Sequence, residues 1–225
     1  MIEKKLIDIH IHNGNDTTNI IAIKNYFIDQ AISLQPDDRI SVGLHPWHID
    51  ETMSQCWIDQ LNNLAKLPQV LAIGETGLDL RKGPSLDIQT EIFIKHIEIA
   101  EAHNLPLIIH CVKAFPNLIE LKKRLKPHSP WIIHGYTGNA ATTAQLIRHN
   151  FFFSFGKRLL LPQSNLSETL KMIPKEFIFF ETDDSGLSVE VIYQRAAEIF
   201  HCSEVELIDL IFRNYQKIFE HSAKK

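Results

Sequence analysis

The 225-residue sequence predicts an α/β fold, a TIM-like (β/α)8 barrel whose first helical connections are shortened. Eight short runs are nearly all apolar, as are the strands of a parallel sheet that is covered on both faces. Helix-like stretches separate most of these runs, and the chain length suits one such barrel. We therefore expect a single domain that covers residues 1–225.

The predicted strands are short and are spread over the whole chain. They lie at residues 6–12, 19–26, 39–46, 69–77, 105–111, 130–138, 150–156 and 176–184. Residues 86–103, 115–126 and 140–149 are helix-like, and Ser203 and Glu206 have the spacing of a capping box that opens a last helix. The first two connections between runs are too short for a crossover helix of about a dozen residues. The first quarter of the barrel should therefore lack outer helices.

Composition indicates an ordinary globular protein with a net charge of −4. A protein that binds nucleic acid mainly through its overall electrostatic field would be basic. The negative net charge therefore argues against such binding but allows a local phosphate-binding site. The three cysteines are far apart in sequence, which suggests neither a disulfide framework nor a CxxC site. We expect them to be small buried residues of a protein in a reducing compartment. No apolar run approaches the roughly 20 residues that span a membrane, and no secretory signal is visible. We expect a cytoplasmic protein with no membrane partner and no obligate protein partner.

Almost every predicted strand ends in a side chain that can bind a metal ion. These residues are His10, His12, His45, Glu75, His110, His134, Glu181 and Asp183. In a parallel barrel the active site lies at the carboxyl ends of the strands, and residues two apart, such as His10 and His12, point to the same face. One histidine at a strand end is usually only hydrogen-bonded, but burying so many titratable groups together is costly unless a cation pairs with them. The set therefore predicts a metal site.

Seven motifs follow one another at the predicted strand ends. In chain order they are DIHIH, GLHPW, AIGETGLDL, LPLIIHCVKA, IIHGYTGN, FFFSFGK and FFETDD. In their order and placement they resemble the TatD family of metal-dependent hydrolases and deoxyribonucleases. The segment EVELIDLIFRNYQKIF, with Asn214 and Phe219, is similar to the closing helix of that family. The resemblance covers most of the chain. No single motif is decisive, and the resemblance is specific because all the motifs occur in this order.

The resemblance implies a TIM-like barrel with divalent metal ions, commonly two, and mixed histidine and carboxylate ligands suit Zn, Mn or Mg. The residues that match the metal ligands of the family are His10, His12, Glu75, His110, His134 and Asp183. Asp183 would join the first two histidines at one ion, and the last two histidines would hold the other. Glu75 would bridge both ions and Asp183 would accept a proton from the attacking water, so these two are the expected catalytic residues. The implied reaction is 3'-to-5' hydrolysis of DNA phosphodiesters.

The surroundings of the implied site depart from the family in two places. The family often has an arginine after the strand-five histidine, but Cys111, Val112 and Lys113 stand there instead. A loop with an Arg-Asn-Glu-Pro motif, which usually follows the strand-eight aspartate, is absent. The expected substrate-binding residues are His45, Lys113 and Lys157, with Arg81, Lys82 and Arg158 on the same rim. For His45 the alternative is that it only caps the turn that follows it.

Three other functions remain open at this point. A small-molecule amidohydrolase or phosphotriesterase would use the same barrel, although such enzymes often place a carbamylated lysine at the bridging position, where Glu75 stands here. A phosphoesterase similar to histidinol phosphatase also opens with His-x-His, but it uses further histidines at other strand ends. A non-catalytic barrel would have lost a ligand, whereas all six are present.

Overall fold

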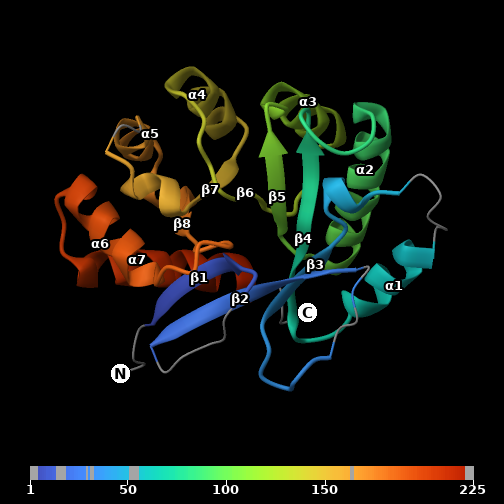
Figure 1. Ribbon diagram of the computed structural model, residues 1–225, viewed down its shortest axis with the longest axis horizontal. Coiled ribbons are helices and arrows are strands. Elements are labelled where there is room, and N and C mark those ends of the chain that lie inside the picture. Colours follow the sequence, from blue (N-terminus) through green and yellow to red (C-terminus); the bar gives the residue numbers. More distant parts are fainter. Residues whose placement is uncertain are drawn as a thin grey trace.

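The computed structural model describes residues 5–13, 19–28, 30, 33–50, 56–162 and 165–220. Its centre is one parallel eight-stranded sheet in which the strands follow one another in chain order (Figure 1). The strands are β1 (Leu6–Ile11), β2 (Ile20–Phe27), β3 (Ile40–Gly43), β4 (Val70–Asp79), β5 (Leu107–Val112), β6 (Trp131–Ile133), β7 (Phe151–Phe155) and β8 (Ile178–Phe180). Every predicted strand is confirmed, although β3, β6 and β8 are shorter than the runs that predicted them.

The barrel closes between β1 and β8 through residues at the carboxyl ends of both strands. The backbone N–H of Asp183 donates to the carbonyl of His10 at 2.9 Å, and the N–H of His12 donates to the carbonyl of Asp183 at 3.2 Å. Ile11 and Asp183 form the parallel bridge that results. Because closure runs through Asp183, the backbone itself brings this residue beside the two histidines of the first strand.

Helices cover the outside of the barrel from β3 onward. They are α1 (Cys56–Leu64), α2 (Leu86–His103), α3 (Phe115–Leu125), α4 (Ala140–Arg148), α5 (Leu166–Met172), α6 (Val189–Phe200) and α7 (Glu204–Tyr215). Short turns of 3-10 helix are η1 (Pro46–His48), η2 (Lys157–Leu160) and η3 (Lys175–Phe177), and a π-helical turn, η4 (Gln216–Glu220), continues α7. Within the described residues no helix lies between β1 and β3, as predicted, and none is long and apolar enough to cross a membrane.

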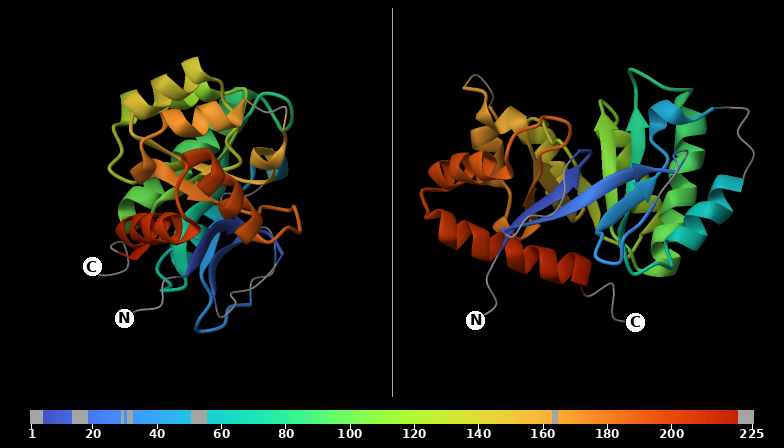
Figure 2. Two further views of the ribbon diagram at one scale, coloured as in Figure 1. Left: turned by 90° about the vertical axis from the view of Figure 1, so that its left-hand side faces the viewer. Right: turned by 60° about the horizontal axis from the view of Figure 1, so that its bottom comes forward.

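The last two helices support the first strand from outside. The Tyr193 hydroxyl of α6 donates to the carbonyl of Ile7 and accepts the N–H of the same residue, both at 3.1 Å. The predicted capping box is present at the start of α7, where Ser203 and Glu206 exchange hydrogen bonds. From there α7 runs along the N-terminal strands, as the right-hand view of Figure 2 shows. The strand that carries His10 is therefore held in place by the other end of the chain.

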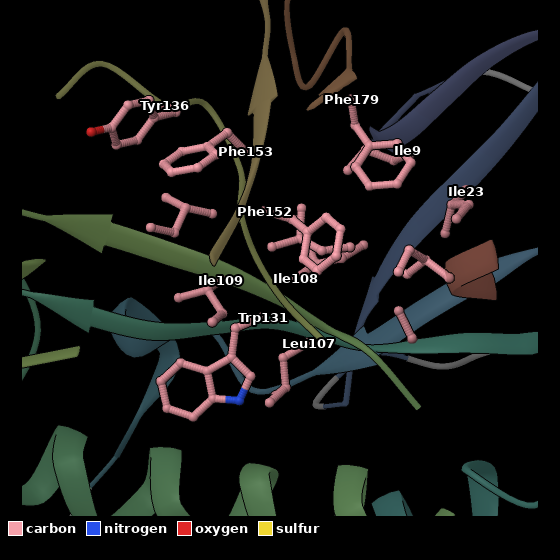
Figure 3. Close-up of a cluster of buried hydrophobic side chains, with 14 of the residues drawn as sticks. Ile9, Ile23, Leu107, Ile108, Ile109, Trp131, Tyr136, Phe152, Phe153 and Phe179 are labelled. Carbon is pink, nitrogen blue, oxygen red and sulfur yellow. The ribbon is translucent and has the colours of Figure 1, made fainter. Parts of the chain in front are cut away.

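Apolar side chains fill the space between the strands and the elements that cover them (Figure 3). Trp131 of β6 packs against Phe93 of α2 with ring centroids 5.3 Å apart, and Phe179 of β8 packs against Phe219 at 5.7 Å. All four side chains are fully buried. Burial of each such side chain contributes roughly 1.5–3 kcal/mol, which stabilises a rigid frame below the polar rim.

Candidate metal centre

The six residues predicted to bind metal ions all lie at the carboxyl end of the barrel. They are His10 in β1, His12 just after it, Glu75 in β4, His110 in β5, His134 just after β6 and Asp183 just beyond β8. Their donor atoms form overlapping groups in which the atoms of a group lie within 4.8 Å of one another. The parallel topology explains this meeting, because all strands of such a barrel end at the same rim.

The first group consists of the two N-terminal histidines and Asp183. Nε2 of His12 lies 3.3 Å from Oδ1 of Asp183, and Nε2 of His10 lies 3.8 Å from the same oxygen. The two rings are 5.0 Å apart and nearly perpendicular. Both Nε2 atoms therefore face one carboxylate oxygen, as two ligands of a shared ion would.

Glu75 lies between this group and the other two histidines. Its Oε2 is 3.5 Å from Nε2 of His10 and 3.6 Å from Nε2 of His12. Its Oε1 is 2.9 Å from Nδ1 of His110 and 2.8 Å from Nε2 of His134. One carboxylate oxygen thus faces each pair of histidines, which is the arrangement that a bridging ligand requires.

The main chain of Glu75 is held by a residue that the sequence did not single out. Oδ1 of Asn25, in β2, accepts the N–H of Glu75 at 2.7 Å and the hydroxyl of Ser41 at 3.1 Å. Asn25 is buried and follows Lys24 in a strand whose other residues are mostly apolar. The sequence signal for this role was an asparagine in a predicted buried strand, because a buried amide needs a hydrogen-bond partner.

A second carboxylate lies behind each of the last two histidines. Nε2 of His110 is 3.2 Å from Oδ2 of Asp79, which also accepts the indole N–H of Trp47 at 2.7 Å. Nδ1 of His134 is 3.3 Å from Oε1 of Glu181. Carboxylates in this position orient metal-binding imidazoles, and the contacts of Asp79 are suited to that role for His110.

The pKa shifts in the cluster follow from its carboxylate and imidazole pairs. Burial by itself would raise the pKa of Glu75, but His134 and the neighbouring histidines outweigh it and hold this pKa well below its usual range. Burial likewise opposes a charge on His134, whereas Glu75 and Glu181 raise its pKa well above the usual value. Glu75 is therefore ionised at neutral pH, the state in which a carboxylate binds a cation.

The donor set fits divalent cations. His10 is fully buried, yet neither of its ring nitrogens has a hydrogen-bond partner among the described residues. An unpaired buried polar group is costly, and a cation on Nε2 would remove that cost. Two ligand atoms about 2.1 Å from one ion are roughly 3–3.5 Å apart. The nitrogen-to-oxygen distances of the cluster, from 2.8 to 3.8 Å, bracket this range.

A family model described as TatD related DNase matches residues 28–220. This span is well over half of the chain and contains four of the six clustered residues. The chain belongs to the TatD family of metal-dependent hydrolases. The resemblance seen in the ordered motifs is thereby confirmed, and the eight-stranded barrel is the fold expected of TatD proteins.

Individual relatives of this TatD chain are similar over most of its length. The uncharacterized metal-dependent hydrolase YabD of Bacillus subtilis (strain 168) is 30% identical over 198 residues, which cover 80% of this chain and 76% of that protein. YcfH of Escherichia coli (strain K12), with the same description, is 28% identical over 151 residues and is covered to 56% of its length.

Solved structures agree in fold. The crystal structure of YjjV, a TatD homologue from Escherichia coli K12, has a TM-score of 0.82 at 19% identity and covers 97% of this chain and 99% of its own. A hydrolase TatD family protein from Entamoeba histolytica has a TM-score of 0.78 at 18% identity, with the same coverage of both chains. At these identities the likeness establishes the fold and nothing finer.

In this TatD chain each ring nitrogen of His45 has a polar partner. One contact fits the turn cap that the sequence left open, and the other places the ring at the cluster. Its Nδ1 accepts the N–H of Trp47 at 3.1 Å and so caps the η1 turn. Its Nε2 lies 3.1 Å from Oε1 of Glu75, which places the ring within the cluster. Burial lowers the pKa of His45. Because Nδ1 accepts a hydrogen bond, the neutral ring carries its hydrogen on Nε2 and can donate it to Glu75, a role beyond the substrate contact that the sequence suggested.

A pocket of about 810 Å³ opens beside the cluster, with His110, His134, Glu181 and Asp183 among its lining residues. Its basic side chains are Arg81, Lys113, Lys157 and Arg158. The pocket thus brings two of the three predicted substrate-binding residues, Lys113 and Lys157, next to the metal cluster. Nζ of Lys157 is also paired with Oδ1 of Asp184 at 2.7 Å, and Lys82 lies instead over the ring of Trp47, 3.7 Å from its centroid.

Proposed function

We propose that the protein hydrolyses phosphodiesters and acts on DNA from the 3' end, with two divalent cations drawn from Zn, Mn and Mg. The observation that carries this proposal is the position of Glu75, whose two carboxylate oxygens face two separate pairs of histidines. Bound cations would supply Lewis acidity and would lower the pKa of water at the site. His10, His12 and Asp183 would hold one cation, and His110 and His134 the other.

Asp183 is the proposed general base. Its side chain is 31% exposed and lines the pocket, so a water molecule can reach it. Burial would raise its pKa, but the hydrogen bond from His12 and the charges of other histidines outweigh burial and lower it. The carboxylate is therefore ionised and able to accept a proton near neutral pH. His12 orients the accepting oxygen from 3.3 Å, and hydrogen bonding to Asp183 raises the pKa of this histidine.

The basic residues of the pocket support a phosphate-containing substrate. Arg81, Lys113, Lys157 and Arg158 line the same pocket as Asp183, although the chain as a whole carries a net charge of −4. Basic side chains concentrated in one cleft raise the local concentration of an anionic substrate without a basic overall charge. We propose that Lys113 and Lys157 contact phosphate groups that flank the bond to be cleaved, and that His45 contacts the substrate from the Glu75 side.

A smaller phosphoester is the second candidate substrate. The side chains of Val112, Phe115, Pro116 and Ile119 give the pocket an apolar wall. A pocket of about 810 Å³ with one apolar wall suits a compact organic group as well as the end of a strand. A small-molecule amidase receives less support, because Glu75 occupies the bridging position that such enzymes often fill with a carbamylated lysine.

The test is hydrolysis of 3'-labelled single-stranded DNA in separate Mg, Mn and Zn series. We expect metal-dependent release of 3' nucleotides, and at least ~100-fold slower release by Asp183→Asn, because the general base is lost. Asp59→Asn is the matched control, since this carboxylate is exposed on α1 and does not line the pocket. A wild-type protein that binds each metal but leaves DNA intact would reject the nuclease, and bis(4-nitrophenyl) phosphate would then test the smaller phosphoester.

A further inference from the structure

We propose that Glu181 is a positioning residue that holds the ring of His134 so that Nε2 points at the metal cluster. This inference rests on the proposed function, because it assigns a role within the two-cation site. Glu181 is fully buried, at 0% exposure, and lies at the carboxyl end of the strand that also leads to Asp183.

The His134 ring lies between two carboxylates. Nδ1 is 3.3 Å from Oε1 of Glu181, and Nε2 is 2.8 Å from Oε1 of Glu75. If Nδ1 donates its hydrogen to Glu181, Nε2 carries the lone pair of the neutral ring and faces the cluster. Glu181 thereby selects both the tautomer and the orientation in which His134 can bind a cation.

The same oxygen of Glu181 also holds the backbone next to His134. Oε1 accepts the N–H of Gly135 at 2.6 Å, so it contacts the ring of one residue and the peptide of the next. Two bonds to one carboxylate oxygen fix the side chain of His134 relative to its own main chain. A ring anchored in this way loses little further freedom when it binds a cation.

Two glycines lie beside the side chain of Glu181. Gly135 has a φ of +53°, which other residues rarely adopt, and a Cβ there would lie 3.6 Å from Oε1 of Glu181. A Cβ on Gly156 would lie 3.3 Å from Cγ of Glu181 and from its carbonyl oxygen. Gly156 therefore leaves room for the buried side chain of Glu181, whereas Gly135 is suited to its position by its positive φ.

The other role open to Glu181 is that of a direct metal ligand. Donor atoms of Glu181, His134 and Asp183 lie within 4.8 Å of one another, and Oε2 of Glu181 has no hydrogen-bond partner among the described residues. Positioning and ligation predict different results for Glu181→Gln. The amide oxygen of glutamine can still accept from Nδ1 and from Gly135, but a neutral amide is a much weaker cation ligand than a carboxylate.

The experiment measures binding of Zn and Mn alone to the full chain by competition with a chromogenic chelator. We expect Glu181→Leu to weaken the affinity at one of the cation sites by about 10–100-fold, and Glu181→Gln to lose less than about tenfold. Glu176→Gln, an exposed glutamate before the same strand, is the control and should match the wild type. Equal losses in the Gln and Leu variants would overturn positioning in favour of direct ligation, and an unchanged Leu variant would overturn any role at the metal.

A second measurement does not depend on the leucine variant being folded. In the zinc-loaded wild-type protein, nitrogen-15 NMR of the histidine rings should show a hydrogen on Nδ1 of His134 that exchanges slowly with water. Glu181→Gln should keep this signal, whereas a wild-type ring protonated on Nε2 would overturn the proposal. Neither measurement needs turnover, so a protein that shows both effects but cleaves no DNA would reject only the proposed nuclease.

Discussion

The backbone N–H of Glu75 donates to Oδ1 of Asn25 at 2.7 Å. This bond reaches from β4 to β2, past β3, and Ser41 of the intervening strand donates its hydroxyl to the same oxygen at 3.1 Å. One buried amide therefore links three strands directly beneath the carboxylate that lies between the two pairs of histidines. The position of that carboxylate depends on a residue that is far from the metal-binding motifs in sequence.

Replacing Asn25 should reduce both stability and metal binding. Asn25→Ala leaves the N–H of Glu75 and the hydroxyl of Ser41 without their acceptor, which should lower the free energy of unfolding by about 1–3 kcal/mol. Urea unfolding of the metal-free protein measures this loss, and chelator competition measures the weaker metal binding. Ser41→Ala is the control, because it keeps the bond to Glu75. If both variants bind metal as tightly as the wild type, Asn25 has no part in placing Glu75.

Lys157 and Asp184 should have opposite effects on substrate binding. The ion pair between them is exposed, and Asp184 competes with a substrate phosphate for the ammonium group of Lys157. We expect Lys157→Ala to raise KM a few-fold and Asp184→Asn to lower it, each corresponding to at most ~1 kcal/mol because exposed charges are screened. The measurement is KM for an oligonucleotide at low and high salt.

Lys171→Ala is the control for this pair, since Lys171 forms a similar exposed ion pair with Glu168 on α5. Its KM should equal that of the wild type at each salt concentration. A rise in KM for Lys171→Ala as large as that for Lys157→Ala would mean that overall charge, and no contact of Lys157, determines substrate binding.

Folding stability should fall in mild acid because of His96. This fully buried ring accepts the N–H of Leu44 on Nε2 at 2.9 Å, and its Nδ1 lies 2.8 Å from the carbonyl of Ile92. Burial lowers the pKa of His96 from 6.5 to about 4. The folded state thus favours the neutral ring, so this stabilisation is complete above pH 6.5 and is lost as the pH falls toward 4.

The acid sensitivity of His96 can be isolated by substitution. Glutamine can accept the N–H of Leu44 but does not titrate, so between pH 7 and pH 4.5 the wild type should lose about 2 kcal/mol more stability than His96→Gln. Urea unfolding at the two pH values gives this difference. His201→Gln, at an exposed position, should lose as much stability as the wild type. Parallel losses for wild type and His96→Gln would show that the ring is not neutral in the fold.

The three cysteines should react at very different rates. The expectation that all are buried is wrong for Cys56, which is exposed, while Cys111 and Cys202 are partly buried. Burial raises the pKa of Cys111 to about 12, so its thiol stays protonated although it lines the pocket. Iodoacetamide at pH 8 should therefore modify Cys56 first and spare Cys111 until the protein unfolds, which mass spectrometry of peptides can follow. Early modification of Cys111 would contradict this assignment.

The sequence by itself determined the barrel and the list of clustered side chains. Strands covered on both faces leave a local signal, a short apolar run, and most runs ended in a polar residue that the parallel topology carries to one rim. The pairing of His10 with Asp183, in the first and last predicted strands, was implied by the resemblance of the ordered motifs to the TatD family. The trimmed first quarter was visible as well, because connection length is a property of the chain alone.

Only the tertiary structure decided how these side chains are held. Asn25 beneath Glu75, Glu181 behind His134, and Lys157 beside Asp184 are contacts between residues that lie far apart in sequence. The direction of a side chain at the end of a strand depends on the residues that neighbouring strands place around it. The apolar periodicity of the sequence does not identify those residues. The identity of the clustered residues is therefore a local property of the sequence, whereas their orientation and charge follow from the packing of the whole barrel.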